Sequence, residues 1–237
     1  MSLTKYIILS KNDRDSIHDN TNNQIFYVNR SLCYLLPSVN HDYYVKHGLF
    51  ESALIEWCKQ FCNRDGAFLD IGAHTGTYAI SLAPFVKKAY AFEPQRMTFY
   101  ALCGGVALSG VNNIECCNYG LGSPDQIGKR TLNIVSLDGG GSSIQENVGI
   151  ISKEIVEIRR LDDVSIEDPI SFIKMDVEGN ELDVLQGAVE TLRKHKYPQI
   201  LFESNYENIE LFNYVKHVLG YTVVNISGVS NMFLATR

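Results

Sequence analysis

The stretch Ala67-Phe68-Leu69-Asp70-Ile71-Gly72-Ala73-His74-Thr75-Gly76-Thr77 decides the fold of this 237-residue chain. Its apolar beginning predicts a strand, its two glycines predict a turn, and helical spacing starts at Thr77. Gly72 and Gly76 allow tight turning and a close approach of the backbone to a ligand. A strand, a glycine turn and a helix start in this order are typical of the place where α/β folds hold nucleotide-type ligands.

A second predicted strand, Lys88 to Phe92, is followed by Glu93-Pro94. An ionised carboxylate only accepts hydrogen bonds and has two oxygens, so Glu93 suits the two hydroxyls of a ribose. Asp70, Glu93, Asp176 and Glu203 each close a predicted parallel strand. Because ligands of open α/β sheets bind outside the carboxyl ends of the strands, we expect these four carboxylates to converge on one rim.

Two kinds of ligand compete for the glycine turn. A dinucleotide site reads Gly-x-Gly-x-x-Gly, but here His74 stands where the second glycine would be. The carboxylate of Asp70 would repel a pyrophosphate at close range, whereas it would attract the ammonium and sulfonium of S-adenosylmethionine. The residues therefore favour S-adenosylmethionine over a nicotinamide dinucleotide, and a turn with no ligand is the third alternative.

The composition is that of a globular protein with one α/β domain, with 45% hydrophobic and 20% charged residues. A formal net charge of -6 argues against sequence-independent binding to nucleic acid, which needs a basic surface. The six cysteines show no zinc spacing and are interpreted as reduced thiols of a cytoplasmic protein. We find no signal-peptide pattern and no apolar run of membrane-spanning length, and therefore expect no membrane insertion.

Strand and helix patterns alternate along most of the chain, which predicts a doubly wound, mostly parallel sheet that ends in an antiparallel pair. Residues 1–40 are interpreted as an N-terminal extension, packed on or preceding a domain of residues 41–237. The glycine-rich residues 120–149 are expected to form a loop on the substrate side. Expected strands cover 6–9, 25–28, 67–71, 88–92, 114–119, 129–135, 155–160, 170–175, 199–203, 220–226 and 231–236, and expected helices cover 43–62, 77–86, 95–109, 180–195 and 207–219.

The run from Phe68 to Gly76, with Ala91-Phe92-Glu93-Pro94, resembles the cofactor motifs of class I S-adenosylmethionine methyltransferases. The run from Ile173 to Glu181, followed by Val184-Leu185-Gln186-Gly187-Ala188, resembles the FkbM-type branch in particular, as do Leu161-Asp162-Asp163 and the strand 200–203. The likeness extends from about Glu51 to the C-terminus. His74 departs from the asparagine that this branch most often has there, although either side chain can form hydrogen bonds.

This resemblance implies a Rossmann-like, seven-stranded sheet whose last strand is antiparallel. It also implies O-methylation of a hydroxyl on a sugar, in a glycan or glycoconjugate, or on another small molecule. The candidate cofactor-binding residues are Glu51, Asp70, Gly72, Ala73, His74, Gly76, Thr77, Glu93, Pro94, Asn118 and Asp176.

The reacting hydroxyl must lose its proton, and Asp176, Glu178 and Glu203 are the candidate catalytic residues. One alternative is a base near Asp176 or Glu178. The other is Mg²⁺ or Mn²⁺ held by Asp176 and Glu203, which would lower the pKa of the hydroxyl. Lys174 shares a strand face with Asp176 and is expected to pair with it, and Glu178 has a second possible role as a helix cap.

Two further functions stay open at this stage. One is a nicotinamide-dependent oxidoreductase, against which Asp70 argues, and the other is a cofactor-binding module without catalysis, against which Asp176 and Glu178 argue. The oligomeric state is left open by the sequence.

Overall fold

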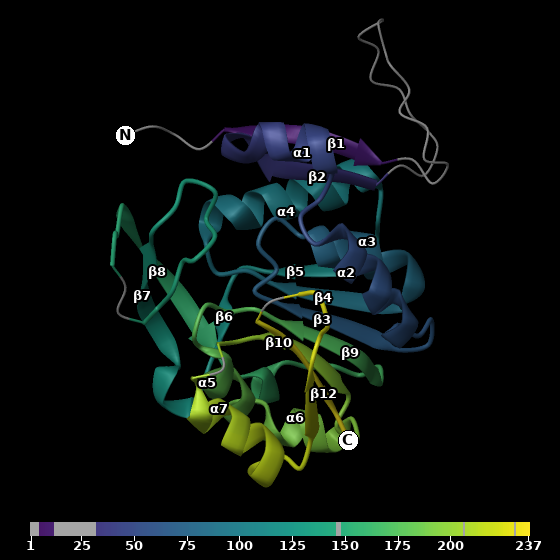
Figure 1. Cartoon of the computed structure of the whole chain (residues 1–237), viewed down its shortest axis with the longest axis vertical. Helices are drawn as coiled ribbons and strands as arrows, with labels where there is room; N and C mark the ends of the chain where they lie inside the picture. The colour runs from purple at the N-terminus through teal and green to yellow at the C-terminus, as the bar shows by residue number, and fades with distance from the viewer. Residues whose placement is uncertain (1–4, 12–31, 146–147, 206, 230) are drawn as a thin grey trace, which may run out of the picture.

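The computed structural model describes residues 5–11, 32–145, 148–205, 207–229 and 231–237. Its centre is a seven-stranded sheet with the strand order β11-β12-β10-β9-β3-β4-β5 (Figure 1). β12 runs antiparallel to both of its neighbours, whereas β10, β9, β3, β4 and β5 are parallel to one another. The doubly wound sheet with an antiparallel last strand is therefore confirmed. The strands are β3 (Ala67–Ile71), β4 (Lys88–Phe92), β5 (Ile114–Cys117), β9 (Ile170–Met175), β10 (Gln199–Glu203), β11 (Thr222–Asn225) and β12 (Met232–Thr236).

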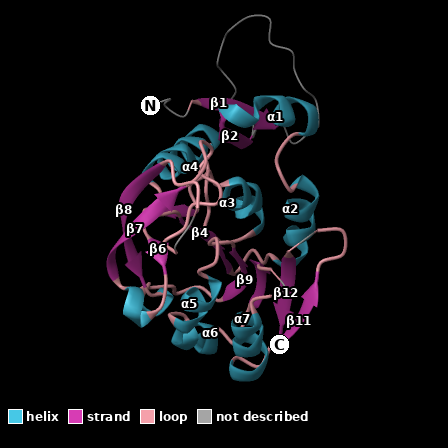
Figure 2. Ribbon diagram, turned by 60° about the vertical axis from the view of Figure 1, so that its left-hand side comes forward, coloured by secondary structure: helices cyan, strands magenta, loops and turns pink. Residues whose placement is uncertain are grey.

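Helices cover both faces of this sheet (Figure 2). Successive residues of a strand point to opposite faces, so β3 sends Phe68 into one buried cluster and Leu69 into the other. α2 and α3 pack on the Phe68 face together with α4, and α5, α6 and α7 pack on the Leu69 face. The helices are α1 (His41–His47), α2 (Ser52–Cys58), α3 (Thr77–Leu82), α4 (Arg96–Ser109), α5 (Glu181–Gln186), α6 (Val189–Lys194) and α7 (Ile209–Asn213).

Two of the expected long helices are interrupted, and a third changes from α-helical to π-helical hydrogen bonding. The expected helix 43–62 breaks between Gly48 and Glu51, whose φ angles of 75° and 54° lie in the left-handed region. The expected helix 180–195 breaks at Gly187, where a Cβ would lie 2.0 Å from the carbonyl oxygen of Gly122. The expected helix 207–219 continues from α7 as a π-helical turn, Tyr214–Val218. Short 3-10 turns are Ser38–Asn40, Lys59–Phe61, Ala83–Phe85, Pro124–Gln126 and Leu161–Asp163.

An N-terminal hairpin, β1 (Tyr6–Lys11) with β2 (Leu32–Pro37), lies over α4 at the top of Figure 1. The expected strand 6–9 lies within β1, whereas the expected strand 25–28 lies outside the described residues. β2 was not expected. Tyr34 and Leu36 of β2 are each 1% exposed and share a buried cluster with β3 and α3. This part of the N-terminal extension is therefore packed on the domain.

A smaller sheet lies beside the glycine-rich segment and has the order β6 (Gly120–Leu121), β8 (Ser152–Arg159), β7 (Gly128–Ile134). β7 and β8 overlap the expected strands 129–135 and 155–160 and pair antiparallel with each other. Among the described residues, no helix combines the length and apolar character that crossing a membrane requires.

Candidate functional site

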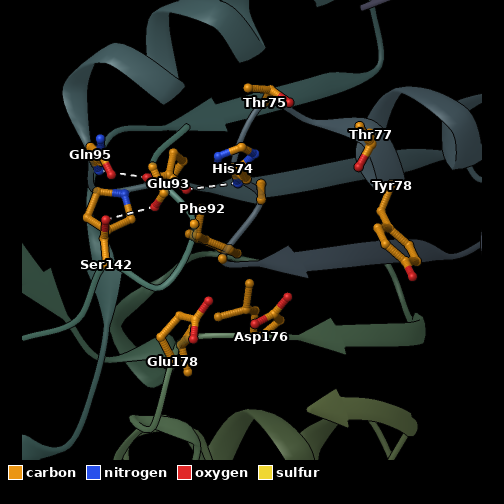
Figure 3. A pocket seen from close by; sticks show the side chains of 18 of the residues that line it. His74, Thr75, Thr77, Tyr78, Phe92, Glu93, Gln95, Ser142, Asp176 and Glu178 are labelled. Atoms are coloured by element: carbon orange, nitrogen blue, oxygen red, sulfur yellow. Dashed lines mark hydrogen bonds between the residues drawn. The ribbon is translucent and has the colours of Figure 1, made fainter. Parts of the chain in front are cut away.

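A cavity of about 290 Å³ opens at the carboxyl ends of β3, β4 and β9. Its floor is formed by the turns that follow these strands. In Figure 3, Glu93 and His74 lie on one side of the cavity, and Asp176 and Glu178 lie on the other. The volume is close to the lower end of the range for small-molecule sites. The sequence motifs after β3, β4 and β9 thus meet at one place, as expected.

The glycine turn after β3 is held tightly by its neighbours. Gly72 has a φ of 79°, and a Cβ there would lie 1.8 Å from the carbonyl oxygen of Asp176, so only glycine fits. The close approach that the sequence suggested is therefore an approach to the β9 turn. The amides of Gly72 and Ala73 donate to the carbonyl of Phe92, at 3.0 and 2.9 Å. These two amides tie the ends of β3 and β4 together.

Glu93 is 6% exposed and is oriented by three donors. One carboxyl oxygen accepts from the amide of His74 at 2.8 Å, and the other accepts from the amide of Gln95 at 2.7 Å and the hydroxyl of Thr98 at 3.0 Å. Burial raises the pKa of Glu93, and these donors oppose that rise. Asn118 does not line the cavity but donates to the carbonyl of Glu93 at 2.9 Å, and so holds the turn from behind.

Asp70 lies behind the cavity rather than in its lining. It is fully buried, and one carboxyl oxygen accepts from the amide of Ala79 in α3 at 2.9 Å. The other oxygen has no partner among the described residues. Burial raises the pKa of Asp70 to about 6, and the nearby ammonium of Lys174 limits that rise. Gly76 is also outside the lining, and its missing side chain makes room for Leu102, 2.3 Å from the position of a Cβ.

Lys174 and Asp176 form a buried ion pair at the end of β9. The ammonium nitrogen is 3.1 Å from Oδ2 of Asp176, and Lys174 is 4% exposed. Burial alone would lower the pKa of Lys174, but Asp176, Asp70 and Glu51 together raise it above its usual value. Burial likewise opposes the ionisation of Asp176, but Lys174 holds the pKa of Asp176 below its usual value. The expected pairing is confirmed, and it keeps Asp176 charged at neutral pH.

Glu203 lies next to Asp176 and belongs to a second cleft beside the first cavity. Burial, followed by the negative charge of Asp176, raises the pKa of Glu203 to about 8. The two carboxyls are hydrogen-bonded, so Glu203 carries the shared proton at neutral pH and donates it to Asp176. The described part of the chain contains no group of three or more His, Cys, Asp or Glu side chains arranged to hold a metal ion.

Glu178 occupies a left-handed backbone position, with a φ of 53°. Its carboxylate accepts from the amide of Gly141 at 2.8 Å, and its carbonyl accepts from the hydroxyl of Ser143 at 2.7 Å. Burial raises its pKa, and the charge of Asp176 adds to the rise. At the start of α5, the carboxylate of Glu181 accepts from the amides of Val177 at 3.3 Å and Gly179 at 3.2 Å. Glu181, and not Glu178, therefore caps these turn amides.

The sequence missed the roof of the cavity, which comes from two segments distant in the chain. Asn40 from the N-terminal extension donates to Asp138 at 2.8 Å, and the ring of His74 is 2.6 Å from the carbonyl of Asp138. The only sequence signal was the glycine- and serine-rich composition of residues 138–142. This composition predicts a loop but does not show which segments the loop contacts. Further lining residues missed by the sequence are Tyr44, Phe50, Thr75, Tyr78, Phe92, Gln95, Asp138 and Ser142.

Most of the expected cofactor residues do line the cavity. They include Glu51, whose carboxylate accepts from the hydroxyl of Tyr78 at 2.8 Å. Three expected residues lie outside the lining, namely Asp70, Gly76 and Asn118. The expected residues in the lining are Glu51, Gly72, Ala73, His74, Thr77, Glu93, Pro94, Asp176 and the catalytic candidate Glu178.

Residues 70–222, more than half of the chain, match the family model described as the methyltransferase FkbM domain. The chain belongs to the FkbM methyltransferase family. Methyltransferases of this kind depend on S-adenosylmethionine, and the recognised motifs are therefore those of a methyltransferase domain.

This FkbM methyltransferase is 28% identical over 149 residues to a protein named Methyltransferase 1 from Beauveria bassiana (strain ARSEF 2860). The match covers 52% of this chain and 58% of that protein, so the chain spans less than two thirds of its relative.

Two solved structures are similar to this chain at 12% identity. One is precorrin-6y C5,15-methyltransferase from Geobacter metallireducens GS-15, with a TM-score of 0.49 over 80% of this chain and 89% of that one. The other is SMU.1697c, a putative methyltransferase from Streptococcus mutans in complex with SAH, with a TM-score of 0.47 over 77% of this chain and 93% of that one. The fold assignment itself rests on the strand order and on the family match.

Proposed function

We propose that this protein is an S-adenosylmethionine-dependent O-methyltransferase whose acceptor is a sugar hydroxyl in a glycan or glycoconjugate. The observation that carries the proposal is the Lys174–Asp176 ion pair, which keeps a carboxylate ionised in the same cavity as Glu93 and the glycine turn. A non-sugar small-molecule hydroxyl is the second candidate acceptor. The acidic chain is proposed to act in the cytoplasm and not on nucleic acid.

The charges that line the cavity suit S-adenosylmethionine. Lys174 is the only lysine or arginine in the lining, against the five carboxyl groups of Glu51, Glu93, Asp138, Asp176 and Glu178. Such a lining attracts a ligand with a sulfonium and an ammonium and repels a pyrophosphate, which argues against the oxidoreductase alternative. The hydroxyl of Thr75, a further lining residue, is buried and has no partner among the described residues.

Glu93 would hold the ribose hydroxyls, and Glu51 with Asp176 would hold the amino acid end of the cofactor. When bound, S-adenosylmethionine supplies a methyl group on a positively charged sulfur. Asp176 is the group proposed to accept the proton of the attacking hydroxyl, because Lys174 keeps it ionised without blocking both oxygens. Glu203, as the protonated partner, would hold the Asp176 carboxylate in one orientation.

A divalent metal on Asp176 and Glu203 is the alternative way to ionise the hydroxyl. The ammonium of Lys174 lies 3.1 Å from Asp176 and would repel such a cation. A metal bound to Asp176 and Glu203 would also have to displace the proton on Glu203, whose pKa is raised to about 8. We therefore propose that Asp176 acts as a direct base.

The experiment compares wild type with Asp176→Asn in two assays. We expect S-adenosylhomocysteine to bind wild type in calorimetry, and NAD not to bind. With methyl-labelled S-adenosylmethionine and glycans extracted from the source cells, Asp176→Asn should lower kcat by roughly 10²–10⁴-fold, the usual effect of losing a positioned base. Asparagine keeps a side-chain oxygen that can accept from the ammonium of the cofactor, so the variant should keep most of its affinity for S-adenosylhomocysteine.

Tight binding of NAD without S-adenosylhomocysteine would contradict the assigned cofactor. Normal turnover by Asp176→Asn would contradict the assigned base. Treatment of wild type with EDTA separates the two mechanisms, because a loss of activity that Mg²⁺ or Mn²⁺ restores would show that the metal, and not a direct base, ionises the hydroxyl.

A further inference from the structure

A second cleft of about 220 Å³ opens beside the cofactor cavity, and Glu178 lines both. The hydrogen bond between Asp176 and Glu203 crosses the boundary as well, because Asp176 lines the first cavity and Glu203 lines the second. The two spaces therefore meet at the proposed base. The side chains that shape the second cleft are mainly Glu178, Glu203, Ser204, Asn205, Asn208 and Asn231.

The lining of this second cleft differs in kind from that of the first. Its described residues include carboxyl, amide and hydroxyl side chains but no apolar, aromatic or cationic one, whereas the first cavity contains Tyr44, Phe50 and Phe92. A planar phenol packs against aromatic or aliphatic side chains, and the described lining of the second cleft includes none. An anionic acceptor such as a sugar phosphate would meet like charges there.

Several polar groups of the cleft are already fixed by the protein, which leaves specific donors. Asn205 and Asn208 each use the side-chain oxygen, which accepts from the amide of Glu207 at 3.1 Å and of Leu211 at 3.2 Å. Among the described residues, no partner is recorded for their NH₂ groups, so these can donate to hydroxyl oxygens of a ligand. Glu203 and Glu178 provide acceptor oxygens in the same cleft. Donors and acceptors held at fixed positions match the alternating hydroxyls of a sugar ring.

We propose that this second cleft is the acceptor subsite and that it selects an uncharged, polyhydroxylated acceptor. The proposal rests on the proposed function and deepens it, because it names both the acceptor class and the residues that recognise it. Asn205, Asn208 and Asn231 are the specificity-determining residues. The bound acceptor would present one hydroxyl past Glu178 to Asp176.

The test uses the protein saturated with S-adenosylhomocysteine and follows the side-chain amide signals of the three asparagines by ¹⁵N NMR. The probes are methyl glycosides of glucose, mannose, galactose, rhamnose and fucose, with catechol and glucose 1-phosphate for comparison. We expect at least one methyl glycoside to shift the signals of Asn205, Asn208 and Asn231 in a saturable manner, and the two comparison compounds to leave them unchanged.

Asn231→Gly should raise the dissociation constant of that glycoside about 3- to 10-fold, the worth of one or two neutral hydrogen bonds. Asn231 has a φ of 64°, which glycine adopts readily, so the fold should be kept. Lys196→Gly is the matched control, since Lys196 has a φ of 60°, is exposed and lies at the opposite end of β10.

Each failure has a separate meaning. If S-adenosylhomocysteine itself does not bind, the proposed function fails. If it binds but no glycoside shifts the three amides, or catechol or glucose 1-phosphate shifts them instead, only the acceptor subsite is overturned. An equal effect of Asn231→Gly and Lys196→Gly would also overturn the role of Asn231.

Discussion

Asp176 and Glu203 are neighbouring carboxyls, and their surroundings leave the first ionised and the second protonated. Lys174 holds the pKa of Asp176 below its usual value, whereas burial and the charge of Asp176 raise the pKa of Glu203 to about 8. One proton is therefore shared, and it resides on Glu203 at neutral pH. Asp176 is therefore the carboxyl that is ionised and free to accept a proton at neutral pH, and Glu203 is its positioning partner.

The change Glu203→Gln tests this charge assignment without an acceptor. In the unfolded chain Glu203 ionises near 4.5, and in the folded chain near 8. Between these values the unfolded state has released a proton that the folded state retains, so the stability of wild type falls as pH rises through this window. Glutamine keeps a donor toward Asp176 and does not titrate. Tm measured from pH 5 to 9 should therefore rise for the variant relative to wild type as pH increases, whereas parallel curves would contradict the raised pKa.

The residues Glu93, Asp176 and Glu178 could be placed in the site from sequence, because each directly follows a strand that ends at the same edge of the sheet. The position of Asp70 outside the cavity could not be predicted from the sequence. Asp70 shares a strand face with Phe68, and that face is covered by α3, where the amide of Ala79 donates to the Asp70 carboxylate. A position near a strand end does not reveal which helix covers the side chain.

At the scale of elements, the glycine-rich segment 138–143 connects the cavity to distant parts of the chain. It belongs to residues 120–149, which were expected to form a loop on the substrate side; Gly139 and Ser142 line the cavity, and Asp138 connects to both Asn40 and His74. Its contacts come from segments distant in the sequence, which composition alone does not reveal. Cofactor affinity should therefore depend on this segment, and not only turnover as a substrate-side loop would imply.

Gly139→Ala should weaken the binding of S-adenosylhomocysteine. Gly139 has a φ of 88°, and a Cβ there would lie 2.7 Å from Cγ2 of Thr98 and 3.2 Å from the amide group of Gln95. A left-handed conformation costs alanine about 1–2 kcal/mol, to which the clash with Thr98 adds. The segment should shift away from Glu93 to relieve this strain, and calorimetry should show roughly a tenfold or larger loss of affinity.

Gly140→Ala is the matched control for this prediction. Its backbone is not left-handed, and the nearest atom to a Cβ is an oxygen of Asp138 at 3.5 Å, which is ordinary contact. The control should bind S-adenosylhomocysteine as wild type does. If both variants bind normally, the segment does not shape the cofactor cavity.

At the scale of the whole molecule, the N-terminal extension and the sheet share one core. Tyr34 and Leu36 of β2 pack with Phe68 of β3, and the chain continues from β2 to Asn40, which contacts the roof of the cavity. The sequence predicted a sheet and its helices from periodicity, but it assigned no role to residues 1–40. The packing of β2 depends on a helix some 70 residues later, which a local pattern does not show.

Docking of this hairpin depends on a small residue in α4, and Gly105→Val should weaken it. Gly105 is buried, and a Cβ there would lie 2.8 Å from Cδ1 of Ile80 and 3.2 Å from the backbone oxygen of Cys33 in β2. The Cβ and two methyl groups of valine would overpack this contact, at a cost of about 1–3 kcal/mol. We expect a lower Tm, faster proteolysis within residues 1–47 and weaker binding of S-adenosylhomocysteine, because the hairpin carries Asn40 to the cavity. Ala107→Val adds the same branched side chain at an exposed position of α4 and should leave all three unchanged. If Gly105→Val lowers Tm but leaves proteolysis and binding unaffected, the hairpin is a stabilising layer and not a support of the site.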